Sequence, residues 1–256
     1  MRTLLTVIQG LAIAYVALCL WLFVMQRSQI YFPVPESNPP GAQSIRVKSG
    51  DAVLKVWVVD RADPRALIYF GGNAEDVSGS LPSFAAAFPG HSLYLVNYRG
   101  YGGSTGRPSE SALFADAAAI YDELRARHPE ISVMGRSLGS GVAAQLASVR
   151  ELQRLVLVTP YDSLVNVARE HFPLFPVALL MRDRYDSATR VRDIRAPALA
   201  VIAGADEIIP RARSEALVAG FPPSRLQVIV LQGATHNSLD LFPGYLRAVA
   251  NFLGAD

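Results

Sequence analysis

The first strong feature of the chain is an unbroken apolar run near its N-terminus. From Leu4 to Met25 no residue carries a charge. A helix of that length, at about 1.5 Å per residue, crosses the roughly 30 Å hydrocarbon core of a bilayer. A cleaved signal peptide has a shorter apolar stretch that ends in small residues, whereas Phe23, Val24 and Met25 end this one. The pattern predicts an uncleaved transmembrane anchor over residues 1–27.

The pattern changes after the anchor. Residues 28–42 are rich in proline and contain few periodic apolar positions, which indicates a linker. Two β-rich runs then flank Ser49-Gly50-Asp51 as in a hairpin. Further on, short apolar runs alternate with helical stretches such as Ser111–Arg127, which is typical of strands buried in a mostly parallel sheet. The expected strands are Ser44–Lys48, Val53–Val59, Leu67–Phe70, Leu93–Val96, Ile131–Met134, Leu155–Val158, Leu199–Ala203 and Leu226–Leu231.

This order of elements predicts one three-layer α/β/α domain over residues 43–256, with an antiparallel opening, a mostly parallel sheet and a short cap. The length of 256 residues is sufficient to bury a full core. A composition of 51% hydrophobic and 18% charged residues is typical of a folded protein and excludes wholesale disorder.

Composition and charge exclude several other classes of protein. The net charge is only +2 and no cluster of basic residues is interleaved with aromatics, so we expect no binding to nucleic acid. Cys19 is the single cysteine, which excludes an internal disulfide and a Cys-rich metal site. The sequence has no H-E-x-x-H or Walker pattern, and we therefore expect no metal and no organic cofactor.

A candidate nucleophile lies in the pentapeptide Gly135-Arg136-Ser137-Leu138-Gly139. This G-x-S-x-G pattern directly follows an expected strand and precedes a helix of small residues, which is the context that the motif requires. Glycines on either side relieve the crowding of a tight turn from strand to helix, and the turn exposes the Ser137 hydroxyl above the sheet. The sequence therefore predicts Ser137 as a catalytic nucleophile.

Four histidines could supply the general base that a serine hydroxyl needs. His91 precedes a strand, at the wrong edge of a parallel sheet, and His128 closes a surface helix before Pro129. His171 is a possible substrate contact. His236 follows the last strand in a polar loop at the carboxyl edge, where ligands gather in such sheets, and it is the predicted base.

A carboxylate should hold the imidazole in the required tautomer. The loop after strand Leu199–Ala203 contains Asp206, which is our choice, with Glu207 beside it as an exposed charge. Asp162, after the preceding strand, is the rival position and is expected to cap a turn. For the oxyanion hole we expect the Leu138 backbone N–H and that of Asn73, with Ala74 as the alternative, in the glycine-containing loop after Leu67–Phe70.

These residues together resemble the α/β-hydrolase superfamily, and in particular its membrane-anchored BEM46-like, ABHD13-like and ABHD17-like serine hydrolases. The resemblance implies the fold and the chain order Ser137, Asp206, His236. In many relatives a histidine stands where Gly71 does here. The tract 100–104 resembles the family's loop after the fourth strand, for which we expect a structural role, with Arg99 anchoring it. The matching segments are Tyr69–Ala74, Asn97–Ser104, Gly135–Gly139, Gly204–Asp206 with Pro210, and Gly233–His236.

The interval between Pro160 and Ile194 contains an apolar stretch that could be either a cap over the site or a core-packing helix. The cap interpretation assigns substrate contacts to Phe172, Leu174 and Phe175. Together with the anchor, it predicts hydrolysis of carboxylic esters or thioesters of small-molecule or lipid-like acyl substrates. A peptidase or a cofactor-free haloperoxidase with the same residues, and a non-catalytic binding protein that kept the fold, are the alternatives.

The flanks of the anchor bear on where the protein resides. Arg2 precedes the apolar run and Arg27 follows it, so the asymmetry of basic residues that sets membrane orientation is nearly balanced. Only Lys48 and Lys55 are lysines and alanine is abundant, which is typical of a GC-rich coding sequence and indicates a bacterium. We expect a single-pass protein of the bacterial inner membrane with its catalytic domain outside the cytoplasm.

Overall fold

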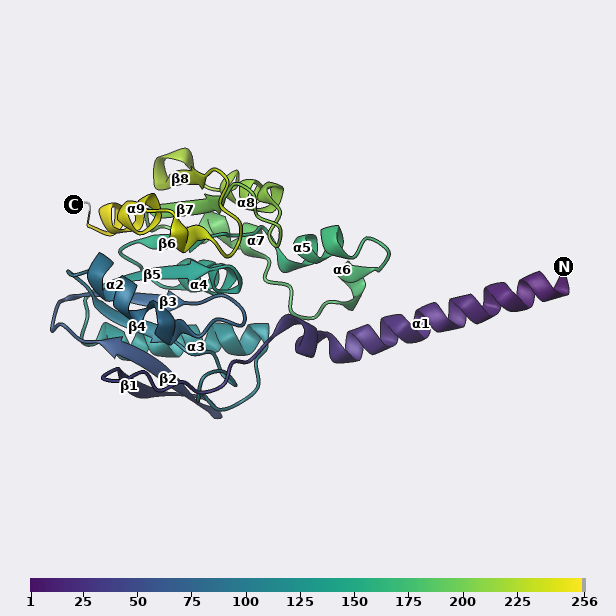
Figure 1. The fold of residues 1–256 in the computed structure, drawn as a ribbon, viewed down its shortest axis with the longest axis horizontal. Helices are drawn as coiled ribbons and strands as arrows, with labels where there is room; N and C mark the ends of the chain where they lie inside the picture. The colour runs from purple at the N-terminus through teal and green to yellow at the C-terminus, as the bar shows by residue number, and fades with distance from the viewer. Residues whose placement is uncertain (255–256) are drawn as a thin grey trace.

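One mixed β-sheet organises the chain. The structure is a computed structural model that describes residues 1–254. Its eight strands lie in the order β1-β2-β4-β3-β5-β6-β7-β8, in which β2 pairs antiparallel with β1 and β4 and all other neighbours are parallel (Figure 1). The expected hairpin and the six expected apolar strands are confirmed: β1 Gln43–Ser49, β2 Ala52–Val59, β3 Arg65–Phe70, β4 Ser92–Val96, β5 Glu130–Arg136, β6 Leu155–Val158, β7 Ala198–Ala203 and β8 Leu226–Leu231.

Helices cover both faces of the sheet, which gives the three predicted layers. Helices α2 and α9 contribute to the buried cluster on one face, and α3, α4 and α8 contribute to the cluster on the other. The helices are α1 Arg2–Ile30, α2 Leu81–Ala87, α3 Glu110–Arg125, α4 Leu138–Val149, α5 Leu164–His171, α6 Val177–Leu180, α7 Ser187–Arg190, α8 Arg211–Val218 and α9 Gly244–Leu253, with short 3₁₀ turns η1 Val77–Ser80, η2 Val191–Asp193, η3 Pro223–Arg225 and η4 Leu239–Leu241.

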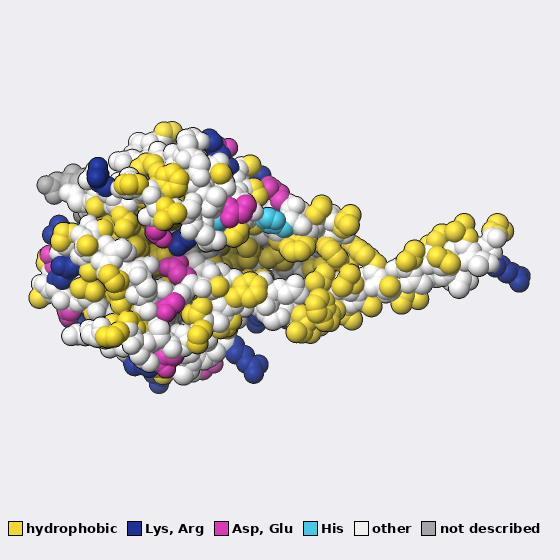
Figure 2. Space-filling model, in the orientation of Figure 1, with side chains coloured by type: hydrophobic (Ala, Val, Ile, Leu, Met, Phe, Trp, Pro, Cys, Tyr) yellow, Lys and Arg dark blue, Asp and Glu magenta, His cyan; other side chains and the backbone are white. Residues whose placement is uncertain are grey.

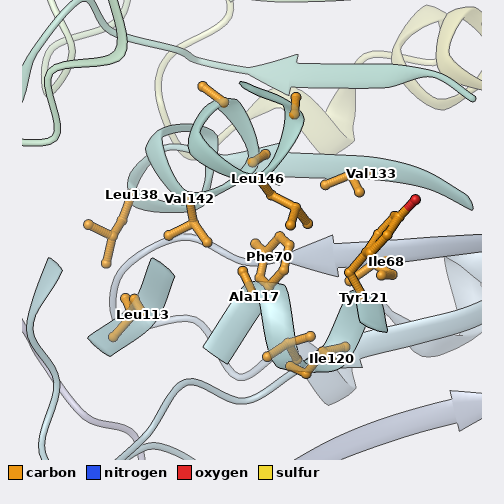
Figure 3. Close-up of a cluster of buried hydrophobic side chains, with 14 of the residues drawn as sticks. Ile68, Phe70, Leu113, Ala117, Ile120, Tyr121, Val133, Leu138, Val142 and Leu146 are labelled. Atoms are coloured by element: carbon orange, nitrogen blue, oxygen red, sulfur yellow. The ribbon is translucent and has the colours of Figure 1, made fainter. Parts of the chain in front are cut away.

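The central strands β3, β4, β6 and β7 are almost entirely apolar because both of their faces are buried. Along β3, Ile68 and Phe70 enter the cluster with α3 and α4, while Leu67 and Tyr69 enter the cluster with α2 and α9. Figure 3 shows Phe70 between α3 and α4. Full burial of one such side chain contributes about 2–3 kcal/mol. The cluster that contains Ile68 and Phe70 holds α4, and with it the turn before α4, on the sheet.

The N-terminal helix projects away from the rounded body (Figure 1). Helix α1 is long and apolar enough to cross a membrane and continues past the expected boundary at residue 27 to Ile30. The segment after it follows the body: Tyr31 is buried, and Glu36 forms an ion pair with Lys55 at 2.9 Å. Helices α5 and α6 form a projection beside the root of α1, and α6 packs against α1.

Candidate active site

The turn between β5 and α4 places Ser137 at the carboxyl edge of the sheet. Its backbone has φ 51° and ψ −118°, a left-handed conformation that costs a non-glycine residue about 1–3 kcal/mol. The Ser137 N–H donates to Val158 O at 2.9 Å. The Ser137 carbonyl accepts from the hydroxyl of Ser140 at 2.7 Å. Neighbouring groups thus hold the strained turn in place.

Both glycines of the motif are required by close backbone contacts. A Cβ on Gly135 would collide with the carbonyl oxygen of Gly139, and a Cβ on Gly139 would collide with the carbonyl oxygens of Phe70 and Gly71. Helix α4 can therefore begin directly against the end of β3 only because these positions lack side chains.

Three predicted residues meet in one hydrogen-bonded chain. His236 Nε2 lies 3.0 Å from Ser137 Oγ, and His236 Nδ1 lies 2.8 Å from Asp206 Oδ2. The Asp206 side chain is 2% exposed, and its Oδ1 accepts the backbone N–H groups of Ile208 at 2.9 Å and Ile209 at 2.7 Å. These bonds fix the carboxylate, and the carboxylate fixes the imidazole ring.

The other histidines lie elsewhere. His91 and His128 are buried; His128 Nε2 is 2.7 Å from Tyr94 Oη, so its expected position on a surface helix is wrong. The reason is that the chain turns inward after α3 and seats the ring against β4. Burial lowers the pKa of His91, which favours its neutral form. His171 lines the pocket described below.

The alternative carboxylates also have other partners. Asp162 accepts from the Ser163 N–H at 2.8 Å and forms an ion pair with Arg213 at 3.1 Å, so it holds a turn as expected. Glu207 is exposed, and its carboxylate accepts the backbone N–H of His236 at 3.2 Å. Asp206 is the carboxylate on the imidazole.

The loop after β3 lies beside the nucleophile. A Cβ on Gly72 would lie 3.8 Å from the Cβ of Ser137, which places Asn73 next to the nucleophile, and Asn73 lines the same pocket. Leu138 is the first residue of α4, so its N–H is one of the donors that a helix leaves unpaired. The two predicted oxyanion donors thus lie in segments that flank Ser137.

Glu75 braces this loop, a contact that the sequence did not reveal. Its carboxylate accepts the Gly72 N–H at 2.6 Å and the Tyr69 hydroxyl at 2.8 Å. The Tyr98 hydroxyl donates to Gly71 O at 2.7 Å. Burial raises the pKa of Tyr69 and of Tyr98 well above the usual range, so both phenols keep their protons and remain donors.

The motif arginine connects this brace to the histidine loop. Arg136 donates to His236 O at 3.1 Å and lies 3.8 Å from the Glu75 carboxylate. Arg99, in contrast, pairs with the buried Asp116 at 2.6 Å, away from the nucleophile, in the structural position expected for it.

A pocket of about 320 Å³ opens at Ser137 and is mostly apolar. The segment between β6 and β7 covers it, so the cap interpretation describes this segment better than a core helix does. Phe172 and Phe175 line the pocket, whereas Leu174 is not on its wall and is 82% exposed. The lining side chains are Leu22, Gln26, Gln29, Ile30, Asn73, Ser137, Leu138, Tyr161, Leu164, Val167, Ala168, His171, Phe172, Phe175, Val177, Leu180, Met181, Ile208 and Ile209.

Four of these residues belong to helix α1, and sequence reasoning assigned none of them to the site. Leu22, Gln26, Gln29 and Ile30 share one face by their spacing. The available signal was a pair of glutamines, Gln26 and Gln29, just after the apolar run. Within residues 1–254 no group of three or more His, Cys, Asp or Glu side chains could hold a metal ion.

A strained serine thus meets a histidine and a carboxylate at the carboxyl edge of a mixed sheet. Known proteins share this fold. A family model for the alpha/beta hydrolase fold matches residues 66–190. Alpha/beta hydrolase domain-containing protein 17C of Mus musculus is 30% identical over 73% of this chain and 59% of its own length. The chain belongs to the α/β-hydrolase family. For this hydrolase, an uncharacterised protein of Mycobacterium tuberculosis is a fuller match, with 34% identity over 97% of the chain and 94% of that protein.

Solved structures agree on the fold. The hydrolase superposes on a Pyrococcus furiosus esterase with a TM-score of 0.70 at 18% identity, covering 87% of this chain and 98% of the esterase. An enol-lactonase from Burkholderia xenovorans gives a TM-score of 0.65 at 15% identity, covering 82% and 100%. Membership of this family, with such neighbours, supports a hydrolase activity.

Proposed function

We propose that the protein is a membrane-anchored serine hydrolase that cleaves carboxylic esters or thioesters through an acyl-enzyme on Ser137. The observation that carries this proposal is the hydrogen-bonded order of Ser137, His236 and Asp206, with Ser137 on the wall of an apolar pocket. The anchor in the proposal is the apolar helix α1, followed by the linker and by the hydrolase domain at residues 43–256.

The proposed reaction follows from the positions of these atoms. Ser137 Oγ attacks the substrate carbonyl carbon while His236 Nε2 takes the hydroxyl proton, and Asp206 stabilises the imidazolium that forms. The tetrahedral intermediate collapses and expels an alcohol or thiol, which leaves with that proton. Water then attacks the acyl-enzyme with His236 as base, which releases the acid and restores Ser137.

The negatively charged oxygen of the tetrahedral intermediate must be stabilised by hydrogen-bond donors. Asn73 and Leu138 are the proposed residues, each through its backbone N–H, and a donor of this kind contributes about 3 kcal/mol to transition-state stabilisation. The predominantly apolar wall of the pocket favours an acyl chain, with Phe172 and Phe175 as proposed contacts. No cofactor enters the proposed reaction.

A fluorophosphonate probe tests the nucleophile, and a panel of p-nitrophenyl esters tests the substrate class. We expect the full-length protein to be labelled and to prefer acyl chains longer than acetate, and Ser137→Ala to lose labelling and hydrolysis. Ser148→Ala is the matched control, because Ser148 lies on the same helix and donates only to Gln145 O at 2.8 Å.

Three outcomes would contradict the proposal. Absence of labelling in the wild type favours a binding protein that kept the fold. Equal labelling of Ser137→Ala places the nucleophile elsewhere. Preferential cleavage of peptides over esters and thioesters favours a peptidase.

A further inference from the structure

The wall of the pocket combines the body of the hydrolase with its N-terminal helix. We propose that the last turns of α1 are part of the substrate-binding site, and that the projection of α5 and α6 lies with α1 in the membrane leaflet, so that the acyl chain enters the pocket from the bilayer. This inference rests on the proposed function, because it names the route and the binding wall of the same substrate.

The first support is the position of four α1 side chains on the pocket wall. Leu22, Gln26, Gln29 and Ile30 line the cavity that contains Ser137. A flexible tether would leave this part of the wall undefined. In this protein the tether and the binding site share the same residues.

The second support is that hydrogen bonds fix the helix in this position. The buried Gln26 side chain donates to Leu180 O at 3.0 Å and accepts the Arg182 N–H at 2.7 Å. The next residue, Arg27, forms an ion pair with Asp183 at 3.0 Å. The wall therefore has a defined geometry relative to the segment that covers the pocket.

The third support is a direct connection between α1 and the oxyanion loop. The Asn73 amide donates to Ile30 O at 2.6 Å and accepts the Phe32 N–H at 3.0 Å. The carbonyl at the end of a helix lacks a partner within the helix, and Asn73 supplies it here. The root of the anchor thus contacts the loop beside Ser137 as well as the pocket.

The depth of the projection follows from the length of α1. The Tyr15 hydroxyl donates to Leu174 O at 2.8 Å, and the Tyr15 ring stacks on Phe175 with centroids 6.1 Å apart. Only residues 2–14 of α1 precede this contact, and at about 1.5 Å per residue they extend about 20 Å. A hydrocarbon core is about 30 Å thick. If α1 spans the bilayer, the level of Leu174 must lie inside it.

The surface of the projection suits this environment. Residues 172–181 contain no charged side chain, and three of their large apolar side chains are exposed: Phe172, Leu174 and Leu179. Figure 2 shows hydrophobic side chains gathered where the projecting helix meets the body, while charged side chains lie on the body and at the far tip of the helix. The bilayer is the occupant that this surface fits, because the patch is continuous with the membrane-spanning helix itself.

A depth measurement tests the position of the projection. The full-length Cys19→Ser, Leu174→Cys protein is labelled with a polarity-sensitive fluorophore and reconstituted into phosphatidylcholine vesicles with quenchers on the acyl chains. We expect at least threefold stronger quenching than for the same label at Val149→Cys, an exposed residue at the opposite end of α4 from Ser137. Equal quenching at the two sites overturns the proposal. Cross-linking of the cysteine at position 174 to a second copy of the protein also overturns it, because the projection would then be covered by protein and not by lipid.

A measurement of acyl-chain selectivity tests whether α1 forms part of the substrate-binding wall. For Leu22→Trp we expect kcat/KM for a long-chain p-nitrophenyl ester, divided by kcat/KM for the acetate, to fall at least tenfold. Leu20→Trp, exposed and off the pocket wall, should leave the ratio within twofold. Leu22→Ala, which enlarges the pocket, should shift the optimum to longer chains, and it serves if Leu22→Trp fails to fold.

The two proposals fail in distinguishable ways. If the wild type neither reacts with fluorophosphonate nor cleaves any ester, the proposed function is overturned, while the quenching experiment still decides where the projection lies. If the wild type cleaves esters but both Leu22 variants keep its chain-length profile, the proposed function stands and the role of α1 in the site is overturned.

Discussion

At the scale of single residues, the site depends on groups whose positions are fixed by bonds that they do not use in the proposed chemistry. Ser137 keeps a left-handed backbone because its N–H and carbonyl are both bonded to neighbours. Asp206 keeps its orientation because two backbone N–H groups donate to it. Such preorganised geometry removes the need to reorient polar groups during the reaction.

Replacing Asp206 by asparagine tests whether the carboxylate orients the His236 imidazole. The amide can donate to His236 Nδ1 and so favour the wrong tautomer, and a loss of kcat of about 10⁴-fold is known for this change in another serine hydrolase. We expect a loss of that order in ester hydrolysis. The control is Glu207→Gln, because Glu207 contacts only the His236 backbone among the three proposed catalytic residues, and the kcat of this variant should change less than tenfold. Similar losses in both variants would show that Asp206 is not the partner of the imidazole.

Glu75 allows a second test at the same scale. Glu75→Ala leaves the buried Tyr69 hydroxyl and the Gly72 N–H without their acceptor, and each unpaired group costs about 1–3 kcal/mol. We expect a free energy of unfolding lower by about 3 kcal/mol and a lower kcat at similar KM, because the loop that carries the proposed oxyanion donor Asn73 loses its brace. Glu75→Gln keeps an acceptor oxygen and should recover part of both. Thermal unfolding and steady-state kinetics measure the two effects, and an unchanged kcat would refute the positioning role.

At the scale of elements, the critical contact is that between the start of α4 and the end of β3. Gly139→Ala would press a methyl group against the Phe70 and Gly71 carbonyls, which are backbone atoms and cannot rotate away. We expect a loss of about 3 kcal/mol of stability or more, because the helix must move off the sheet. Gly244→Ala at the start of α9 meets nothing within 4 Å and should change stability by less than about 1 kcal/mol. Thermal unfolding of both variants is the measurement, and equal stabilities would contradict the close approach.

The elements themselves were predictable because their signals are local. Each buried strand is a short apolar run, and the motif around Ser137 needs only its own strand and helix for context. The loops that follow β7 and β8 meet because parallel strands share a carboxyl edge, which is why Asp206 and His236 could be chosen.

What the sequence could not provide are contacts between distant segments and the directions of side chains on irregular backbone. The Asn73 bond to Ile30 O joins residues 43 positions apart, and no periodic pattern encodes it. Leu174 stands in the same apolar run as Phe172 and Phe175, yet only the last two line the pocket. The burial of His128 likewise depends on how the chain turns after α3.

At the scale of the whole molecule, helix α1 and the hydrolase body form one structure. Asp183 is buried and accepts from both Arg27 and the Tyr31 hydroxyl, the latter at 3.1 Å. Burial raises the pKa of Tyr31, so its hydroxyl remains a donor at physiological pH. The residue that follows the helix is thereby held by the same carboxylate as the helix itself, and this carboxylate belongs to the segment between β6 and β7 that covers the pocket.

A double-mutant cycle measures this coupling. Arg27→Met and Asp183→Asn should each lower the free energy of unfolding. The double variant should lose less than the sum of the two single losses, and the difference, which is the coupling energy, should be about 1 kcal/mol. The value is modest because the Arg27 side chain is half exposed and solvent screens the pair. The exposed pair Arg211–Glu215, at 2.7 Å on α8, is the matched control and should couple by no more than about 0.5 kcal/mol. Additive effects at Arg27 and Asp183, measured by thermal unfolding of the full-length protein in detergent, would show that helix α1 and the body are energetically independent.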